Sequence, residues 1–217
     1  MKKKLFLFAL TFCLSICIST IAYADLDLEL DDAGGSGPMK EGFVTLKGGL
    51  DMMGEVEIEV EGESDDSDIK NGFSVSIELG KVVRENVAIG VGATYQLERG
   101  IDEDTGDVDP KFNFVPIFGL VKFWTDAGDF FPYGTVHIGY NLFMGNEDFK
   151  KFGGELEDEM DLGGGLYWGL GGGIMLANGV QFELLYSVNN GTGEIEDYDV
   201  EIDVSYSKVT ISAGISF

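Results

Sequence analysis

The chain has 217 residues, of which 39 are acidic and 14 are basic, so its formal net charge at pH 7 is −25. A chain this acidic is a poor partner for nucleic acid or for an anionic membrane surface. Its two cysteines, Cys13 and Cys17, lie near the N-terminus, which excludes a disulfide, a thiolate nucleophile or a cysteine-based metal site from the rest of the chain.

The N-terminal segment has the three parts of a cleavable secretory signal. Lys2, Lys3 and Lys4 precede the apolar stretch Leu5 to Ile21, which ends in the small-residue pattern Ala22-Tyr23-Ala24. An uncleaved helical anchor is the alternative, but polar residues interrupt the apolar stretch. We therefore predict that residues 1–24 are a signal peptide and that cleavage before Asp25 removes both cysteines.

The next segment, residues 25–41, is acidic and rich in glycine, which predicts a flexible tail. Nothing after Asp25 contains the roughly 18 consecutive apolar residues of a transmembrane helix. A membrane-bound form must therefore cross as strands, because only helices and closed barrels satisfy every backbone polar group in hydrocarbon.

From Gly42 onward, the dominant pattern is alternation of apolar residues with a period of two, which is the period of a β-strand. The alternation is clean in Phe73–Gly80, Val87–Glu98 and Val180–Asn189 and less regular in five further segments, with an ambiguous phase around Pro116. Each segment is close to the roughly 9–11 residues that a tilted strand needs to cross a bilayer. In the last segment the apolar phase slips between Tyr206 and Val209, which predicts a bulge near Ser207. The eight predicted strands are Phe43–Met52, Phe73–Gly80, Val87–Glu98, Phe112–Trp124, Tyr133–Met144, Leu166–Ala177, Val180–Asn189 and Tyr206–Phe217.

Short and long connections alternate between these strands. The short turns are at residues 84–86 and 126–129 and at Asn178-Gly179, a strong two-residue hairpin signal. The long acidic loops are Glu61–Asn71, Arg99–Pro110, Gly145–Gly163 and Asn190–Asp203. This order predicts an all-β fold, an eight-stranded antiparallel up-and-down transmembrane β-barrel over residues 42–217, with short turns on one rim and long loops on the other. Both chain ends then lie on the short-turn, periplasmic side.

The last predicted strand ends in an aromatic residue: Val209, Ile211, Ala213 and Ile215 alternate up to Phe217. In this respect, and in the segments 115–117, 122–124, 132–133 and 139–140, the chain resembles the small outer-membrane barrel family, which includes the transmembrane domain of outer membrane protein A. The resemblance implies a barrel-only member in the outer membrane, reached by export through the periplasm, with outer-membrane lipids as partners. It also implies that the outer-membrane assembly machinery reads Phe217.

The main structural alternative is a soluble eight-stranded carrier of the lipocalin kind, which shows the same alternation with its faces reversed. Glycine and charge on the face assigned inward, and the absence of a helix after the barrel, favour the membrane form. So do the aromatic residues near strand ends, namely Phe112, Phe123, Trp124, Phe131, Tyr133 and Trp168.

Charged side chains of both signs fall on the predicted inner face. Eight strands enclose an interior only just wide enough for side chains, so we predict a lumen plugged by paired charges. Glu183 and Lys208 are the preferred partners because their strands are neighbours in sequence. The inward residues are Lys47, Glu78, Glu98, Lys122, His137, Glu183 and Lys208.

His137 is the only histidine, and its phase places it in the lumen. A hydrogen-bonded interior histidine is the preferred interpretation. The alternative is the general base of a barrel lipase or deacylase, which would have to open toward the bilayer. One histidine without cysteine does not support a zinc site.

Two further patterns resemble ligand-binding loops. The glycine clusters at residues 163–165 and 171–173 lack the helix and the Lys-Ser/Thr pair of a phosphate-binding loop, and we expect them to make room for large inward neighbours. Asp102–Asp109 has carboxylates spaced as oxygen ligands for calcium. Gly106 comes one place early for that motif, so a solvated acidic loop is preferred.

We therefore predict no enzyme, and no catalytic, cofactor-binding or metal-binding residues. The predicted function is a structural or surface-interaction role, in which long acidic extracellular loops meet divalent cations or basic partners. A narrow channel or carrier for small molecules is the first alternative, and a lipid-modifying enzyme is the second.

Overall fold

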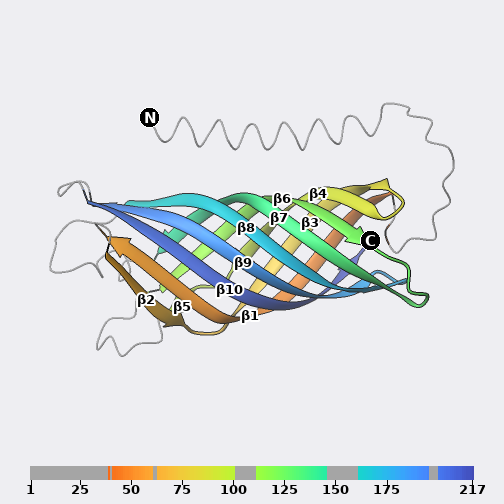
Figure 1. The fold of residues 1–217 in the computed structure, drawn as a ribbon, viewed down its shortest axis with the longest axis horizontal. Helices are drawn as coiled ribbons and strands as arrows, with labels where there is room; N and C mark the ends of the chain where they lie inside the picture. Colours follow the sequence, from red (N-terminus) through yellow and green to blue (C-terminus); the bar gives the residue numbers. More distant parts are fainter. Residues whose placement is uncertain (1–38, 40, 61–62, 101–110, 146–160, 196–199) are drawn as a thin grey trace. The chain divides into compact units, whose positions relative to one another are not determined.

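The computed structural model describes residues 39, 41–60, 63–100, 111–145, 161–195 and 200–217. These residues form an antiparallel sheet of ten strands that closes on itself, because β10 pairs with β1 (Figure 1). The described ranges contain no helix long and apolar enough to cross a membrane. The strands are β1 (Gly42–Val60), β2 (Glu63–Ile69), β3 (Gly72–Arg84), β4 (Val87–Gln96), β5 (Arg99–Gly100), β6 (Lys111–Trp124), β7 (Phe130–Gly145), β8 (Asp161–Leu176), β9 (Val180–Ile195) and β10 (Val200–Ser216).

Eight of the described strands build the wall of the barrel, in the order β1, β3, β4, β6, β7, β8, β9 and β10. The two short strands extend the wall: β2 pairs with β1 beyond β3, and β5 pairs with β6 beyond β4. The predicted eight-stranded antiparallel barrel is thus confirmed. We call the end that carries β2 and β5 the loop end, and the opposite end, where short connections join β3 to β4 and β8 to β9, the turn end (Figure 1).

The outer face of the barrel is apolar. On β3, Phe73 is 62% exposed and Val75 is 61% exposed, whereas Glu78 is fully buried. A soluble carrier barrel has its apolar side chains inside, so the lipocalin alternative is wrong. We call the exposed apolar side chains of segments 44–50, 73–79, 89–95, 121–123, 136–140, 166–174, 182–186 and 211–217 the apolar belt.

The strands are longer at the loop end than predicted, so two predicted loops are wrong. Most of Glu61–Asn71 is β2, and β9 and β10 continue through most of Asn190–Asp203. On β1 and β10 the alternation continues there, with the exposed Glu57 and Asp203 next to the buried Val56, Ile202 and Val204. The charged residues make these segments look like loops in the sequence. In the other two predicted loops, Arg99–Gly100 and residues 161–163 are strand, while residues 101–110 and 146–160 lie outside the described residues.

The predicted bulge near Ser207 is located on the neighbouring strand instead. Met52 lies opposite Val209 and Glu55 lies opposite Ser207, so β1 carries one residue more than β10 between these pairs. Met53, with a φ of 52°, occupies the bulge. The pairing of β10 with β9 is regular through this region, so the predicted slip in β10 does not occur. The apolar phase changes in the sequence because the inward residues Val204 and Tyr206 are apolar near the loop end, whereas the apolar Val209 lies on the outer face.

Both chain ends of the barrel are tied to its turn end. The predicted tight turn at Asn178-Gly179 is confirmed, with Gly179 at a φ of 86°. Met39 is buried in the lumen, and the Glu41 carbonyl accepts a hydrogen bond from the Val82 N–H at 2.8 Å. The last residues of the predicted tail therefore contact the mouth of the barrel, which buries the Met39 side chain. Residues 1–38, with the predicted signal peptide, lie outside the described residues.

Candidate functional site

The lumen is filled by buried side chains from the loop end to the turn end. Buried apolar residues form a loop-end cluster of Val56, Ile69, Phe112, Phe114, Phe143, Ile202, Val204 and Tyr206. A turn-end cluster contains Met39, Phe43, Ala88, Phe118, Leu120, Trp124, Phe131, Tyr133, Tyr167 and Met175. We call the buried charged and hydrogen-bonding side chains the polar layer. They lie between the two clusters and partly among the turn-end residues, as Lys122 does between Leu120 and Trp124 on β6.

Aromatic rings close the loop end. The Phe114 ring stacks on Phe143 with 4.7 Å between centroids, and it lies parallel to Tyr206 at 5.9 Å. Phe112 meets Tyr206 edge-on at 5.6 Å. Offset-stacked and edge-on pairs are the arrangements that the ring quadrupoles favour, so the rings are stabilised as one packed unit across the lumen.

The part of the polar layer nearer the turn end is a chain of ion pairs between strands. Lys47 on β1 pairs with Glu78 on β3 and with Glu183 on β9, where the Nζ to Oε1 distance is 2.7 Å. Lys122 on β6 contacts the other oxygen of Glu78 at 2.7 Å. The Tyr133 hydroxyl donates to Glu183 at 3.0 Å. Two lysines and two glutamates therefore compensate one another inside the barrel.

The part nearer the loop end is built around one carboxylate, that of Asp51. It pairs with Arg99 and with Lys208, whose Nζ lies 2.8 Å from Oδ2. The hydroxyls of Thr210 and Ser74 donate to Oδ1 at 2.5 and 3.1 Å. Hydrogen bonds to both oxygens stabilise the buried charge, which would otherwise be costly away from water.

His137 lies in the lumen, as predicted, and is 2% exposed. Its ring stacks on Phe118 with a centroid distance of 4.4 Å. One ring nitrogen faces the Thr135 hydroxyl at 3.1 Å, and the other faces the Tyr167 hydroxyl at 3.4 Å. This is the environment of a hydrogen-bonded interior histidine, and the side chain points away from the apolar belt.

Six of the seven predicted inward residues are buried in the lumen, and Glu98 is the exception because β4 ends at Gln96. The predicted pairing of Glu183 with Lys208 is wrong. Ser187 lies opposite Lys208, and Glu183 lies four residues along β9 opposite Ser212, so each charge finds another partner.

The sequence interpretation missed Asp51 and Arg99 as lumen residues. Asp51 shares the odd-numbered inward phase of Lys47, and this signal was available in the sequence. Arg99 lay in a predicted loop, and no local pattern marks it as buried.

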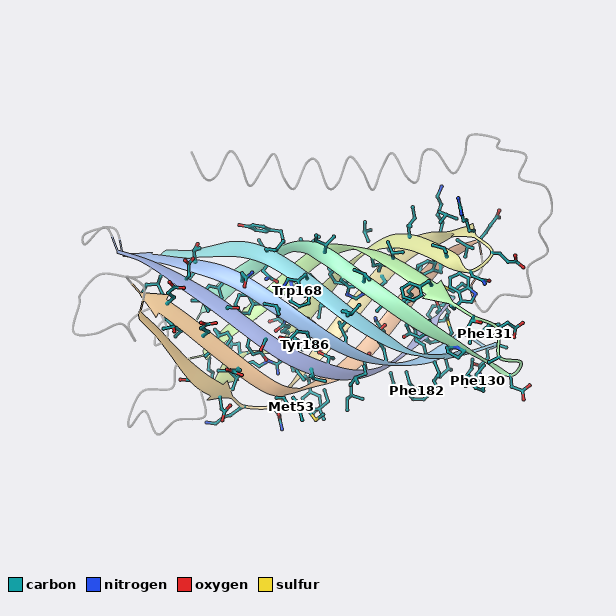
Figure 2. All side chains as sticks on the ribbon, viewed as in Figure 1. Met53, Phe130, Phe131, Trp168, Phe182 and Tyr186 are labelled. Carbon is teal, nitrogen blue, oxygen red and sulfur yellow. The ribbon has the colours of Figure 1, made fainter. Side chains whose placement is uncertain are left out.

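The predicted aromatic residues near strand ends divide between the two faces. Phe112, Trp124, Phe131 and Tyr133 point into the lumen, so these four do not contribute to the outer surface of the barrel. Phe123 and Trp168 are exposed. Figure 2 shows Trp168 and Tyr186 side by side on the outer surface, where their rings meet edge-on at 5.7 Å.

The two glycine clusters of the sequence lie in one strand. Residues 163–165 and 171–173 are part of β8. A Cβ at Gly171 would come within 2.9 Å of the Leu185 side chain, which confirms that glycine makes room for a large neighbour there.

Within the described ranges, no group of three or more His, Cys, Asp or Glu side chains is placed to hold a metal ion. Asp102–Asp109 lies outside those ranges.

No known family and no curated protein matches this sequence. Solved structures match the fold. Outer membrane protein AlkL, determined in lipid bilayers by solid-state NMR, aligns with a TM-score of 0.53 and 16% identity over 89% of this chain and 96% of that one. Outer membrane protein OprG from Pseudomonas aeruginosa aligns with a TM-score of 0.50 and 15% identity over 84% and 98% of the two chains. The chain has the fold of the small outer-membrane β-barrels.

Proposed function

We propose that this protein is an integral outer-membrane β-barrel with a closed lumen and a structural or surface-interaction role. The observation that carries the proposal is the filling of the lumen by the two apolar clusters and the polar layer. A barrel of eight strands encloses a space that side chains can fill, and here they do so along its length. We propose no catalytic role, because the His137 ring is enclosed among Phe118, Thr135 and Tyr167.

The apolar belt supports a location in the outer membrane, with lipids as its partner. Belt side chains such as Phe73 and Ile138 are 62% and 64% exposed, and exposed apolar side chains occur on all eight wall strands. An apolar surface this large is rarely exposed to water. Export to this location would use the proposed signal peptide, residues 1–24.

The loop end carries an acidic outer surface that we propose faces the cell exterior. Glu55 on β1 lies opposite Asp68 on β2, and Glu59 lies opposite Asp203 on β10. Like charges directly opposite each other on a sheet destabilise it. Divalent cations or basic partners would relieve this repulsion. We call the exposed carboxylates Glu55, Glu57, Glu59, Asp68 and Asp203 the acidic extension.

The position of Phe217 supports a role in assembly. Its backbone N–H donates to the Val44 carbonyl at 2.9 Å, so the residue lies at the seam where β10 closes on β1. Its side chain is 56% exposed. We propose that the outer-membrane assembly machinery recognises this ring.

Cysteine labelling tests both the location and the orientation. The chain has no cysteine after Cys17, so Glu57→Cys, Ile138→Cys and Arg84→Cys each place one thiol on the described barrel, at the acidic extension, the belt and the turn end respectively. A membrane-impermeant maleimide should label Glu57→Cys in intact cells and Arg84→Cys after the outer membrane is permeabilised. Ile138→Cys should react after detergent solubilisation and unfolding.

Two results would contradict the proposal. Labelling of Arg84→Cys but not Glu57→Cys in intact cells would reverse the orientation. Reaction of Ile138→Cys in intact membranes at the rate of Glu57→Cys would mean that the belt is not in lipid.

Conductance separates the structural role from the channel alternative. Purified barrel reconstituted in planar bilayers should show no steady ion current, because aromatic rings close the loop end. A double variant, Phe114→Ala with Phe143→Ala, removes two stacked rings and serves as the reference for a loosened lumen. A steady current through the unmodified protein would make the channel the better assignment.

A further inference from the structure

The polar layer contains a small cavity between the Asp51 group and the Lys47 group. Its volume is about 20 Å³, and its lining includes Lys47, Glu183, Lys208, Gln96 and Ser187. One water-sized sphere needs roughly 10–15 Å³ on this scale. The cavity is therefore large enough for a single water molecule and too small for an organic ligand.

Three of the lining side chains carry a buried polar atom without a hydrogen-bond partner among the described residues. One of these atoms, Glu78 Oε1, is ion-paired with Lys47. The other two are Gln96 Oε1 and Ser187 Oγ, and each of these residues is 1% exposed. The direction of the Gln96 amide is set, because its Nε2 donates to Asn189 Oδ1 at 3.1 Å and Asn189 Nδ2 donates to the Tyr206 carbonyl at 3.3 Å. An unpaired buried polar atom costs stability, so both atoms call for a partner inside the cavity.

The lining selects the chemistry of that partner. Gln96 Oε1 requires a donor, while the Ser187 hydroxyl can donate or accept. The charges that line the cavity cancel, since Lys47 and Lys208 are matched by Glu78 and Glu183. An anion would face the carbonyl oxygen of Gln96, and a cation would face two ammonium groups. A neutral molecule that both donates and accepts satisfies the site.

We propose that one ordered water molecule occupies this cavity and hydrogen-bonds to Gln96 Oε1 and Ser187 Oγ. Gln96 is on β4 and Ser187 is on β9, which lie four places apart in the ring of eight wall strands and so face each other across the lumen. The water adds a second link beside the direct bond from Gln96 to Asn189. It thereby connects opposite walls at the level where the two groups of ion pairs meet.

Solid-state NMR of the full barrel in lipid bilayers tests this site. Magnetisation transferred from water should reach the Gln96 side-chain amide in the unmodified protein at short mixing times, although this residue is sealed from both ends. Ser187→Ala should reduce that transfer several-fold. Thr45→Val removes another buried lumen hydroxyl, one that pairs directly with Ser216 at 2.8 Å, and should leave the transfer unchanged.

Heat-modifiable mobility on detergent gels establishes that each variant is folded before it is compared. If Ser187→Ala does not fold, the transfer to Gln96 in the unmodified protein decides the matter alone. Absence of transfer there, or equal loss in Ser187→Ala and Thr45→Val, would overturn the proposal. A crystal soaked in bromide that showed anomalous density in the cavity would replace the water with an anion.

Discussion

The buried charges of the lumen depend on one another residue by residue. Lys47 forms ion pairs with Glu78 and Glu183, and Lys122 forms an ion pair with Glu78. A buried charge whose partner is removed keeps its desolvation cost and loses its compensation. The loss of stability caused by a substitution here therefore depends on whether it leaves a buried charge without a partner.

Lys47→Met should therefore destabilise the barrel by about 3–5 kcal/mol, because it leaves Glu183 without its cation. The double variant Lys47→Met with Glu183→Gln keeps the Glu78–Lys122 pair and should be more stable than Lys47→Met alone. Urea unfolding in lipid vesicles measures both, with the exposed Lys70→Met as the control, expected within about 0.5 kcal/mol of the unmodified protein. A double variant less stable than the single one would contradict this compensation.

The inward residues could be predicted from the sequence, but their partners could not. The period of two assigns Lys47, Glu78 and Lys208 to one face from local information alone. Pairing depends on how far one strand is shifted against the next, and this shift is set by the whole barrel. The bulge at Met53 adds a residue to β1, which the alternation in β10 does not reveal.

At the scale of the elements, the bulge at Met53 lets β1 contribute side chains both to the ion pairs and to the loop-end cluster. Asp51 and Val56 both point into the lumen although their numbers differ by an odd count, because Met53 takes up one position on the outside. Without the extra residue, either the ion pairs or the loop-end cluster would lose its β1 contribution. Met53 is 79% exposed and adopts a left-handed backbone conformation.

A pair of substitutions at Met53 tests this conformation. Met53→Gly should be more stable than Met53→Ala by about 1 kcal/mol, because a Cβ is unfavourable in the left-handed region. Both variants lose the same exposed side chain, so the backbone alone separates them. At Met52, in regular strand, the order should reverse, with alanine favoured over glycine by about 0.5–1 kcal/mol. Chemical denaturation of the four variants would refute the bulge if the two positions ranked alanine and glycine alike.

The end of β10 supports a second test on this scale. Phe217→Ala keeps the backbone bonds to Val44 but removes the exposed ring. We expect a several-fold drop in assembled barrel in cells, with unassembled protein in the periplasm, while refolding into detergent micelles proceeds normally. Ile215→Ala, also on the belt, is the matched control. Equal loss of assembly in the two variants, or none in either, would remove the special role of the ring.

Element boundaries were harder to predict than element identity. Strands β1, β9 and β10 continue well past the belt, where Glu55, Glu57 and Asp203 occupy the outer face. In the sequence, these charged residues indicate a loop. On a closed sheet they are compatible with strand, because the inward partners Val56, Ile202 and Val204 bury their side chains in the loop-end cluster.

For the whole molecule, two patterns were enough to predict the barrel: the alternation of apolar residues in eight segments and the order of short and long connections. Any up-and-down barrel has both patterns because of its geometry. The filling of the lumen was predicted only as a mixture of charges. That two apolar clusters enclose the charges could not be read from the sequence, since apolar residues then lie on both faces.

The charge of the whole barrel is concentrated outside its polar layer, which predicts a dependence on salt. Raising NaCl from about 10 mM to about 0.5 M should slow hydrogen exchange of amides 55–59 on β1, because ions screen the carboxylates of the acidic extension. Amides 44–50, in the belt, should exchange at the same rate in both conditions. The variant Glu57→Gln should reduce the salt effect, and an equal effect on the two segments would contradict its electrostatic origin.

The buried apolar side chains of the lumen form two clusters, one toward each end of the barrel. The loop-end cluster is built from the ends of strands beyond the belt, and the turn-end cluster holds the opposite mouth. Proteins open locally in cooperative units of different stability, so we expect each cluster to open as a unit of its own. We then expect the loop end to open and re-form while the membrane-spanning part of the barrel stays folded.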